Sequence, residues 1–233
     1  MKCDPCNKIV LGGAGSGKST VINILKQWIH LILRKEGDNP DCPYVIVTAP
    51  TGTAASNVRG QTLHSALGFN FGNKHYSLSD KKRDKVRKLF KNLRVLIIDE
   101  ISMIKSDLLY QLDLRLREIT QKPNKLFGGL AIFLMGDIMQ LRPCKGSFIF
   151  EEPTCKDYLA AYLCKTHWHS FEVINLEENH RQGADHTYAE ILNRIRVGEH
   201  TENDMNILST RVRPEGHPDL FGAMYCPIKY LFF

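Results

Sequence analysis

The sequence predicts an α/β fold, in which a mostly parallel sheet carries helices on both faces. Short apolar runs without polar alternation are typical of parallel strands that are buried on both sides. Five such runs occur, at 8–11, 44–47, 94–98, 130–135 and 171–176. Segments with helical periodicity lie between them. At 233 residues, 43% of them hydrophobic and 24% charged, the chain is long enough to bury a proper core.

A glycine-rich loop follows the first apolar run and matches the pattern GxxxxGK[ST]. Its residues are Gly12, Gly13, Ala14, Gly15, Ser16, Gly17, Lys18, Ser19 and Thr20. Glycines let the backbone fold around a phosphate with its N–H groups turned inward, and the helix expected at 19–34 adds a partial positive charge. We therefore predict a nucleotide-binding loop, with Lys18 on the β- and γ-phosphates and Ser19 on Mg²⁺. The alternative is a turn that binds no ligand.

The expected helix at 19–34 carries apolar residues around most of its circumference. Such a helix is usually buried on several sides. We therefore expect it to pack between the sheet and other elements.

An acidic pair, Asp99 and Glu100, follows the third apolar run. Opposite a phosphate loop, an aspartate at this place holds Mg²⁺, and an adjacent glutamate orients and deprotonates the attacking water. We predict these roles for Asp99 and Glu100. A plain strand end with two carboxylates is the alternative.

Polar residues also follow the other predicted strands. Small and hydroxylated residues at 48–55 stand where α/β folds bind ligands, although an ordinary strand-to-helix turn would look similar. A short helix is expected at 61–67, and its His64 is either structural or functional. Gln140 could sense the γ-phosphate or serve the fold, and Arg181 could stabilise a transferring phosphoryl group or form a surface ion pair.

A basic segment at 81–94 holds eight basic residues and one acid. Its apolar residues recur at helical spacing, which predicts an amphipathic helix with a basic outer face. That face is either simply solvated or a contact surface for a phosphate backbone.

Charge and cysteine content indicate which partners and which cellular compartment are compatible with the sequence. The net charge of +6 permits an anionic partner without requiring one. Seven scattered cysteines, with no signal peptide before them, indicate free thiols in a reducing intracellular compartment. We favour the nucleus, with the mitochondrion or a viral factory as alternatives. Because no apolar run reaches roughly 18 residues, we expect no membrane span.

Seven motifs in order resemble one family. They are GGAGSGKST, APTGTAA, TLHSALG, IIDEISM, GDIMQLRP, LEENHRQ and LNRIRVGEH. The set is similar to the Pif-one (petite integration frequency) group of superfamily 1B DNA helicases, with RecD-type helicases as more distant relatives. The resemblance runs from about residue 8 to about residue 222. It implies a RecA-like P-loop domain that hydrolyses ATP and moves 5′ to 3′ along single-stranded DNA.

The resemblance also implies roles for individual residues. Gly15, Gly17, Lys18, Ser19 and Thr20 would bind nucleotide and Mg²⁺, and Asp99 and Glu100 would serve Mg²⁺ and water activation. Gln140 would contact the γ-phosphate, and Arg181 would act as an arginine finger. A DNA strand would touch Pro50, Thr51, Gly52, Thr53, Thr62 and His64, with little sequence preference.

Some family features are absent from the sequence. The adenine-reading glutamine motif, the second RecA-like domain and its HKSQG-like and ALSR-like motifs are missing. We therefore expect one motor domain at 1–222, with a basic helical insertion near 70–93 and an atypical tail at 223–233 that suggests truncation. Unwinding by this chain alone should be weak or absent, because ATP in this family is closed between two domains. The alternatives are a non-catalytic fragment that binds nucleotide or DNA, and another P-loop motor such as a clamp-loader-like ring.

Overall fold

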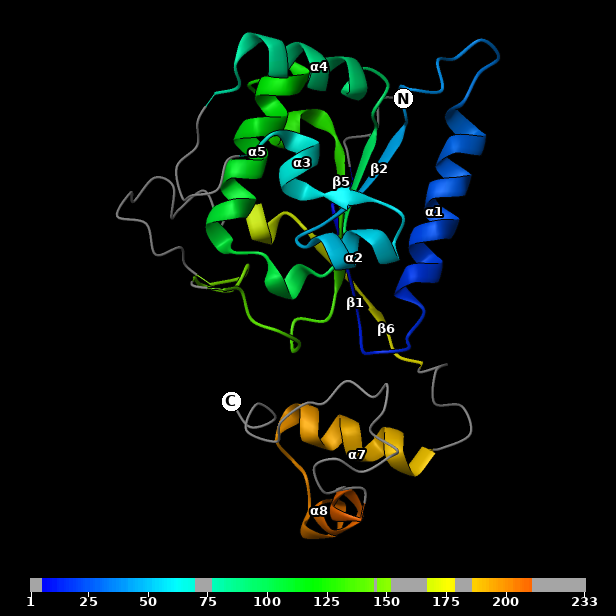
Figure 1. Ribbon diagram of the computed structural model, residues 1–233, viewed down its shortest axis with the longest axis vertical. Coiled ribbons are helices and arrows are strands. Elements are labelled where there is room, and N and C mark those ends of the chain that lie inside the picture. Colours follow the sequence, from blue (N-terminus) through cyan, green and yellow to red (C-terminus); the bar gives the residue numbers. More distant parts are fainter. Residues whose placement is uncertain (1–5, 70–76, 145, 152–166, 179–185, 211–233) are drawn as a thin grey trace, which may run out of the picture. The chain divides into compact units, whose positions relative to one another are not determined.

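The computed structural model describes residues 6–69, 77–144, 146–151, 167–178 and 186–210. It divides the chain into two compact units, residues 1–183 and 184–233. The sheet lies in the first unit (Figure 1). Both clusters of core residues also belong to this unit. The prediction of a single domain over 1–222 stays a prediction, and the tail at 223–233 lies outside the described residues.

Six strands form one sheet in which every neighbouring pair is parallel. The order across the sheet is β3-β2-β4-β5-β1-β6. The strands are β1 (Lys8–Gly12), β2 (Val45–Ala49), β3 (Gln61–Thr62), β4 (Val95–Ile98), β5 (Ala131–Gly136) and β6 (Glu172–Leu176). This confirms the predicted α/β fold and its parallel sheet.

Helices cover the two faces of the sheet unequally. They are α1 (Lys18–Leu33), α2 (Gly52–Asn57), α3 (Leu63–Leu67), α4 (Asp80–Phe90) and α5 (Ser106–Thr120). Figure 1 shows α3, α4 and α5 on one side of the strands and α1 on the other. Burial on both faces explains why the sequence of β4 has no polar alternation. Leu96 and Ile98 belong to the core cluster on the α5 side, and Val95 and Ile97 belong to the cluster on the α1 side.

The expectation that α1 packs on several sides is wrong. Ile22 is its one fully buried residue, and Val21, Leu25 and Ile29 are partly buried against the sheet. A strip of large apolar side chains next to this face is exposed. It comprises Ile24 (46%), Trp28 (64%), Leu31 (81%) and Ile32 (73%). Periodicity identified the helix, but no described element covers its outer side.

Two predicted helices also have different boundaries. The segment 61–67 begins as strand β3, because Gln61 and Thr62 pair with Thr48 and Ala49 of β2. Helical periodicity over 102–120 also predicts one helix that begins at Ser102. That helix is interrupted, since a 3₁₀ helix at Ile101–Met103 is followed by extended backbone at Ile104. Lys105 then forms an isolated antiparallel bridge with Phe148, and α5 begins at Ser106.

The basic segment forms α4, as predicted. Val86 and Leu89 are partly buried and Phe90 is fully buried, against the main core. Part of its charge has partners inside the protein: Arg83 pairs with Asp80, and Arg87 donates to the carbonyl of Glu118 at 3.0 Å. Lys81, Lys82, Lys85 and Lys88 are exposed, so a phosphate-contact surface stays a prediction.

The described part of the second unit contains helices α7 (His186–Val197) and α8 (Glu202–Ser209). Helix α8 has a capped N-terminus, because Thr201 and Asp204 form a reciprocal capping box. Asp204 also accepts two hydrogen bonds from the Arg194 guanidinium, at 2.8 and 2.7 Å. These bonds hold the pKa of Asp204 well below its usual range and tie α7 to α8.

Candidate nucleotide-binding site

One cavity of about 890 Å³ brings together the predicted residues from three separate motifs. It lies at the carboxyl ends of the strands, where parallel sheets bind ligands. It is lined by Ala14, Gly15, Ser16, Gly17, Lys18, Ser19, Thr20, Val21, Ala54, Asn57, Asp99, Glu100, Gln140 and Leu176. The loop, the acidic pair and Gln140 thus share one space, although they are far apart in sequence.

The backbone of the glycine-rich loop adopts a conformation that residues with a Cβ atom rarely adopt. Gly15 and Gly17 have φ angles of 83° and 84°, in the left-handed region that favours glycine. The Lys18 ammonium donates to the carbonyls of Gly12 and Gly13, at 2.8 and 2.9 Å. These bonds hold the lysine charge over the loop at the N-terminus of α1, where the helix dipole also favours an anion.

Gly12 does not line the cavity but is needed for the shape of the loop. A Cβ atom at this residue would stand 2.2 Å from the Ser16 Oγ and 3.1 Å from the Leu176 Cβ. The Ser16 hydroxyl cannot turn away freely, because it donates to the Gly13 carbonyl at 2.9 Å. The first glycine of the motif is therefore required by packing inside the loop.

We expect Gly12→Ala to distort the loop and to destabilise the fold by about 1–3 kcal/mol, the usual range for overpacking. Thermal unfolding and the affinity for a fluorescent ATP analogue measure both effects. Gly52→Ala is the matched control, because a Cβ at Gly52 meets no atom within 4 Å. Wild-type stability together with wild-type nucleotide affinity in Gly12→Ala would contradict the packing argument.

Asp99 is buried at the end of β4, with 7% of its surface exposed. Its backbone N–H donates to the Thr48 carbonyl at 2.9 Å, which fixes its position across the sheet. Burial raises the pKa of the Asp99 carboxyl, while a backbone hydrogen bond at Glu100 and the charge of Lys18 lower it. Among the described residues, its Oδ1 atom has no hydrogen-bond partner. A buried, unpaired carboxylate oxygen facing a phosphate loop fits the requirements of Mg²⁺.

Glu100 stands in the left-handed region, with φ 55° and ψ 53°. Strain of this kind costs of order 1–3 kcal/mol for a non-glycine residue and is concentrated at functional sites. Gly136 at the end of β5 makes room beside it, because a Cβ there would lie 2.8 Å from the Ile101 nitrogen. Burial and the charges of Asp99 and Asp137 raise the pKa of Glu100, and Lys18 opposes them. A raised pKa suits a general base.

Gln140 lies in the turn after β5 and is exposed to the cavity. Asp137 fixes this turn: its carbonyl accepts from the Gln140 N–H at 3.0 Å, and its carboxylate from the Met139 N–H at 3.1 Å. The same aspartate acts electrostatically on Glu100. The predicted arginine finger, Arg181, lies outside the described residues.

The predicted DNA-contacting residues do not line the cavity but gather at one edge of the sheet. Pro50, Thr51, Gly52 and Thr53 follow β2. Thr62 is the last residue of its parallel neighbour β3, and His64 lies just after it, in α3. Thr51 and Thr62 have structural roles, since their hydroxyls accept from Ala54 and Ser65 N–H groups, both at 3.2 Å. His64 is half-buried, its ring edge-on to Phe69, and burial lowers its pKa.

Sequence reasoning missed four residues that line the cavity: Val21, Ala54, Asn57 and Leu176. Ala54 and Asn57 come from α2. Ala54 lies in the segment 48–55, where a ligand was expected, but it was not assigned to the nucleotide. Asn57 carries no such signal, because its place in the cavity depends on how β2 positions α2 beside the loop.

Other site types find less support in the described residues. Within these ranges, no group of three or more His, Cys, Asp or Glu side chains is arranged to hold a metal ion. Cys6, Cys42 and Cys144 are free thiols. No helix in the described part of the chain is both long and apolar enough to span a membrane.

Comparison with known proteins supports the sequence resemblance. The sequence matches the PIF1-like helicase family over residues 4–206. It is 33% identical over 218 residues to the ATP-dependent DNA helicase PIF1 of Saccharomyces cerevisiae (strain YJM789), covering 87% of this chain and 23% of that protein. The human ATP-dependent DNA helicase PIF1 is 33% identical over 80% of this chain and 26% of its own length. The chain thus spans about a quarter of the length of these relatives.

Solved structures agree with the fold. The crystal structure of Pif1 helicase from Candida albicans has a TM-score of 0.72 and 28% identity, over 96% of this chain and 46% of that one. Pif1 from Bacteroides, solved with ADP-AlF3 and single-stranded DNA, has a TM-score of 0.63 and 29% identity, over 89% of this chain and 46% of that one. The RecA-like fold and the resemblance to the Pif-one group are confirmed. The chain belongs to the PIF1-like helicase family.

Proposed function

We propose that this chain is the ATP-binding motor part of a 5′–3′ DNA helicase, which binds Mg·ATP in the cavity and single-stranded DNA at the edge that carries Pro50–Thr53. The observation that carries the proposal is the convergence of the loop, Asp99, Glu100 and Gln140 on one cavity. The solved structures of Bacteroides Pif1 with ADP-AlF3 and single-stranded DNA support both ligands. Roles in DNA repair, recombination and telomere maintenance follow from the family.

The proposed mechanism gives each residue of the cavity one task. The loop N–H groups and Lys18 hold the phosphates, and Lys18 exchanges its two carbonyl partners for phosphate oxygens. Ser19 and Asp99 would hold Mg²⁺, which would supply positive charge to neutralise the phosphates. Glu100 takes the proton of the attacking water. Gln140 contacts the γ-phosphate, and Arg181 stabilises charge on the phosphoryl group as it transfers.

DNA binding is proposed at the ends of β2 and β3. Contacts from Pro50, Thr51, Gly52 and Thr53, with Thr62 and His64, reach the strand through its backbone. Hydrogen bonding within this edge keeps the two threonines in place, so the surface is preorganised. Sequence preference should be weak, because backbone contacts do not read bases.

Full activity requires a second RecA-like domain, in this chain or in another, because helicases of this family close ATP between two such domains. The nucleus is the proposed location, since the relatives are DNA helicases.

ATP turnover by the purified chain, measured by phosphate release with and without an oligo(dT) strand, tests the proposal. We expect slow turnover that rises with DNA, and little unwinding of a 5′-tailed duplex. Robust unwinding by the chain alone would contradict the need for a second domain. Absence of any DNA-stimulated turnover, with nucleotide binding intact, would favour the alternative of a non-catalytic binding fragment. An ATP-dependent ring in size measurements would instead favour a clamp-loader-like motor.

A further inference from the structure

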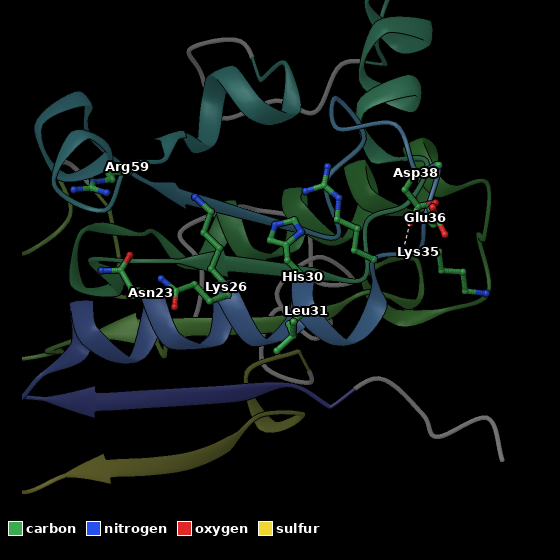
Figure 2. Close-up of a pocket in the computed structure, with 11 residues that line it drawn as sticks. Asn23, Lys26, His30, Leu31, Lys35, Glu36, Asp38 and Arg59 are labelled. Carbon is green, nitrogen blue, oxygen red and sulfur yellow. Dashed lines mark hydrogen bonds between the residues drawn. The ribbon is translucent and has the colours of Figure 1, made fainter.

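A second, open groove of about 850 Å³ lies along α1 and shares no lining residue with the nucleotide-binding cavity. Figure 2 shows its walls, which come from α1, from the loop after α1 and from the turn after α2. Four cationic side chains line it: Lys26, Arg34, Lys35 and Arg59. None of the nucleotide-binding motifs accounts for this concentration of charge.

Three of the four groove cations make no close polar contact through their side chains in the described part of the chain. Lys26, Arg34 and Arg59 form no side-chain hydrogen bond and no ion pair there. Two carboxylates also line the groove. Figure 2 shows that both, Glu36 and Asp38, stand at one end beside Lys35.

Asp38 is already engaged by protein donors. It accepts from the Lys35 backbone N–H at 2.7 Å and from the Tyr44 hydroxyl at 2.8 Å. These bonds lower the pKa of Asp38, and the charges of Lys35 and Arg34 lower it further, so Asp38 stays ionised and offsets part of both charges. The groove still keeps a net positive charge, because four cations line it against two carboxylates.

His30 lies between these cations and responds to them. Burial lowers the pKa of His30, and the charges of Lys26 and Arg34 lower it further. Its ring packs edge-on to Tyr44, with 6.4 Å between ring centroids. A neutral imidazole thus stands where like charges converge, and an anion bound beside it would relieve their repulsion.

The spacing of the cations selects the kind of anion. Lys26 lies on α1 and Arg34 is the residue that caps its C-terminus, eight residues later, so their backbones stand about 12 Å apart along the helix axis. Long Lys and Arg side chains can converge over that distance, but a row of cations that Arg59 extends from another element suits successive phosphates of a polymer. Arg59 lies two residues beyond α2, a six-residue helix that begins inside the proposed DNA segment Pro50–Thr53. The helix α2, about 9 Å long, therefore connects that segment to Arg59 in the groove.

We propose that this groove binds the phosphate backbone of a single-stranded nucleic acid, as a continuation of the strand path that begins at Pro50–Thr53. The identity of the ligand rests on the proposed function, whereas the location of the groove does not. The groove would hold the strand while the nucleotide cavity changes state, because the two sites share no lining residue.

The salt dependence of oligo(dT) binding tests this site. Each neutralised phosphate of a single strand contributes about −0.7 to the slope of log K against log salt concentration. Arg34→Gln combined with Arg59→Gln should therefore make the slope less negative by about 1.4. Both side chains are exposed, so folding should be unaffected. Lys122→Gln combined with Lys125→Gln is the matched control, because these exposed lysines lie away from the groove and should leave the slope unchanged.

A photo-crosslinker at Gln27, which lines the groove, should capture the strand, whereas one at Lys122 should not. An unchanged slope in the arginine variant would overturn the groove site while leaving the proposed function in place, provided that the wild-type chain binds DNA. Failure of the wild-type chain to bind DNA would overturn both. Loss of inorganic tripolyphosphate binding in the arginine variant, with an unchanged DNA slope, would mark a site for small anions instead and overturn the proposal.

Discussion

Glu100→Gln should lower ATP turnover by about 10²- to 10⁴-fold, the usual contribution of a general base. Glutamine keeps the size and the hydrogen-bonding reach of the side chain but cannot accept a proton. Nucleotide affinity should therefore change little, and DNA binding should persist. Phosphate release under single-turnover conditions, beside equilibrium binding of an ATP analogue, separates the two effects. Equal turnover in the variant and the wild-type chain would contradict the role of Glu100 as the general base.

The pH dependence provides a second readout of the same residue. Burial and the neighbouring carboxylates of Asp99 and Asp137 raise the pKa of Glu100 above its usual value of 4.5. The catalytic form is the ionised one, so wild-type turnover should be full above the raised pKa and fall as the pH decreases through it. The residual turnover of Glu100→Gln should lack this step. Glu178→Gln, a change in an exposed glutamate that does not line the cavity, should keep the wild-type profile.

Lys18→Ala should weaken ATP-analogue binding by about 10- to 100-fold, because hydrogen bonds to charged groups contribute roughly 1.5–3 kcal/mol. The lysine ammonium now rests on the Gly12 and Gly13 carbonyls, and no other cation lines the cavity among the described residues. Isothermal titration measures the loss directly. A second measure is the unfolding temperature, which ATP should raise less in the variant than in the wild-type chain.

Two controls make the Lys18 result specific. Lys122→Ala removes an exposed lysine that does not line the cavity and should retain wild-type affinity. Lys18→Arg keeps the charge but changes its geometry, and should recover only part of the binding. Unchanged nucleotide affinity in Lys18→Ala would place the nucleotide elsewhere and would contradict the site as a whole.

Five of the six strands and the motif residues of the cavity were predictable from the sequence for a physical reason. A parallel strand buried on both faces leaves a continuous apolar run, and its ligand-binding residues follow immediately, as Asp99 follows β4. Strand β3 was not predictable, because two residues carry no periodicity and become a strand only through their partners in β2. The left-handed backbone of Glu100 was equally hidden, since it depends on the space that Gly136 leaves.

The exposed strip of α1 shows a different limit. Its sequence describes an apolar helix, but burial depends on how many neighbours the fold supplies on that side of the sheet. The contribution of α2 to the cavity is of the same kind, because Asn57 reaches the site through the placement of a whole helix.

The order of the strands sets a fixed span within the site. Strand β5 lies between β1, which leads into the phosphate loop, and β4, which leads into Asp99 and Glu100. Two strand spacings separate the two halves of the chemistry, about 9–10 Å, and hydrogen-bonded ladders on both sides of β5 prevent that distance from shrinking. Adjustment to a nucleotide as it is hydrolysed must therefore come from side chains and loops. The turn that carries Gln140 is best placed to respond to hydrolysis of the nucleotide, because this turn directly follows β5, the strand between the two halves of the site.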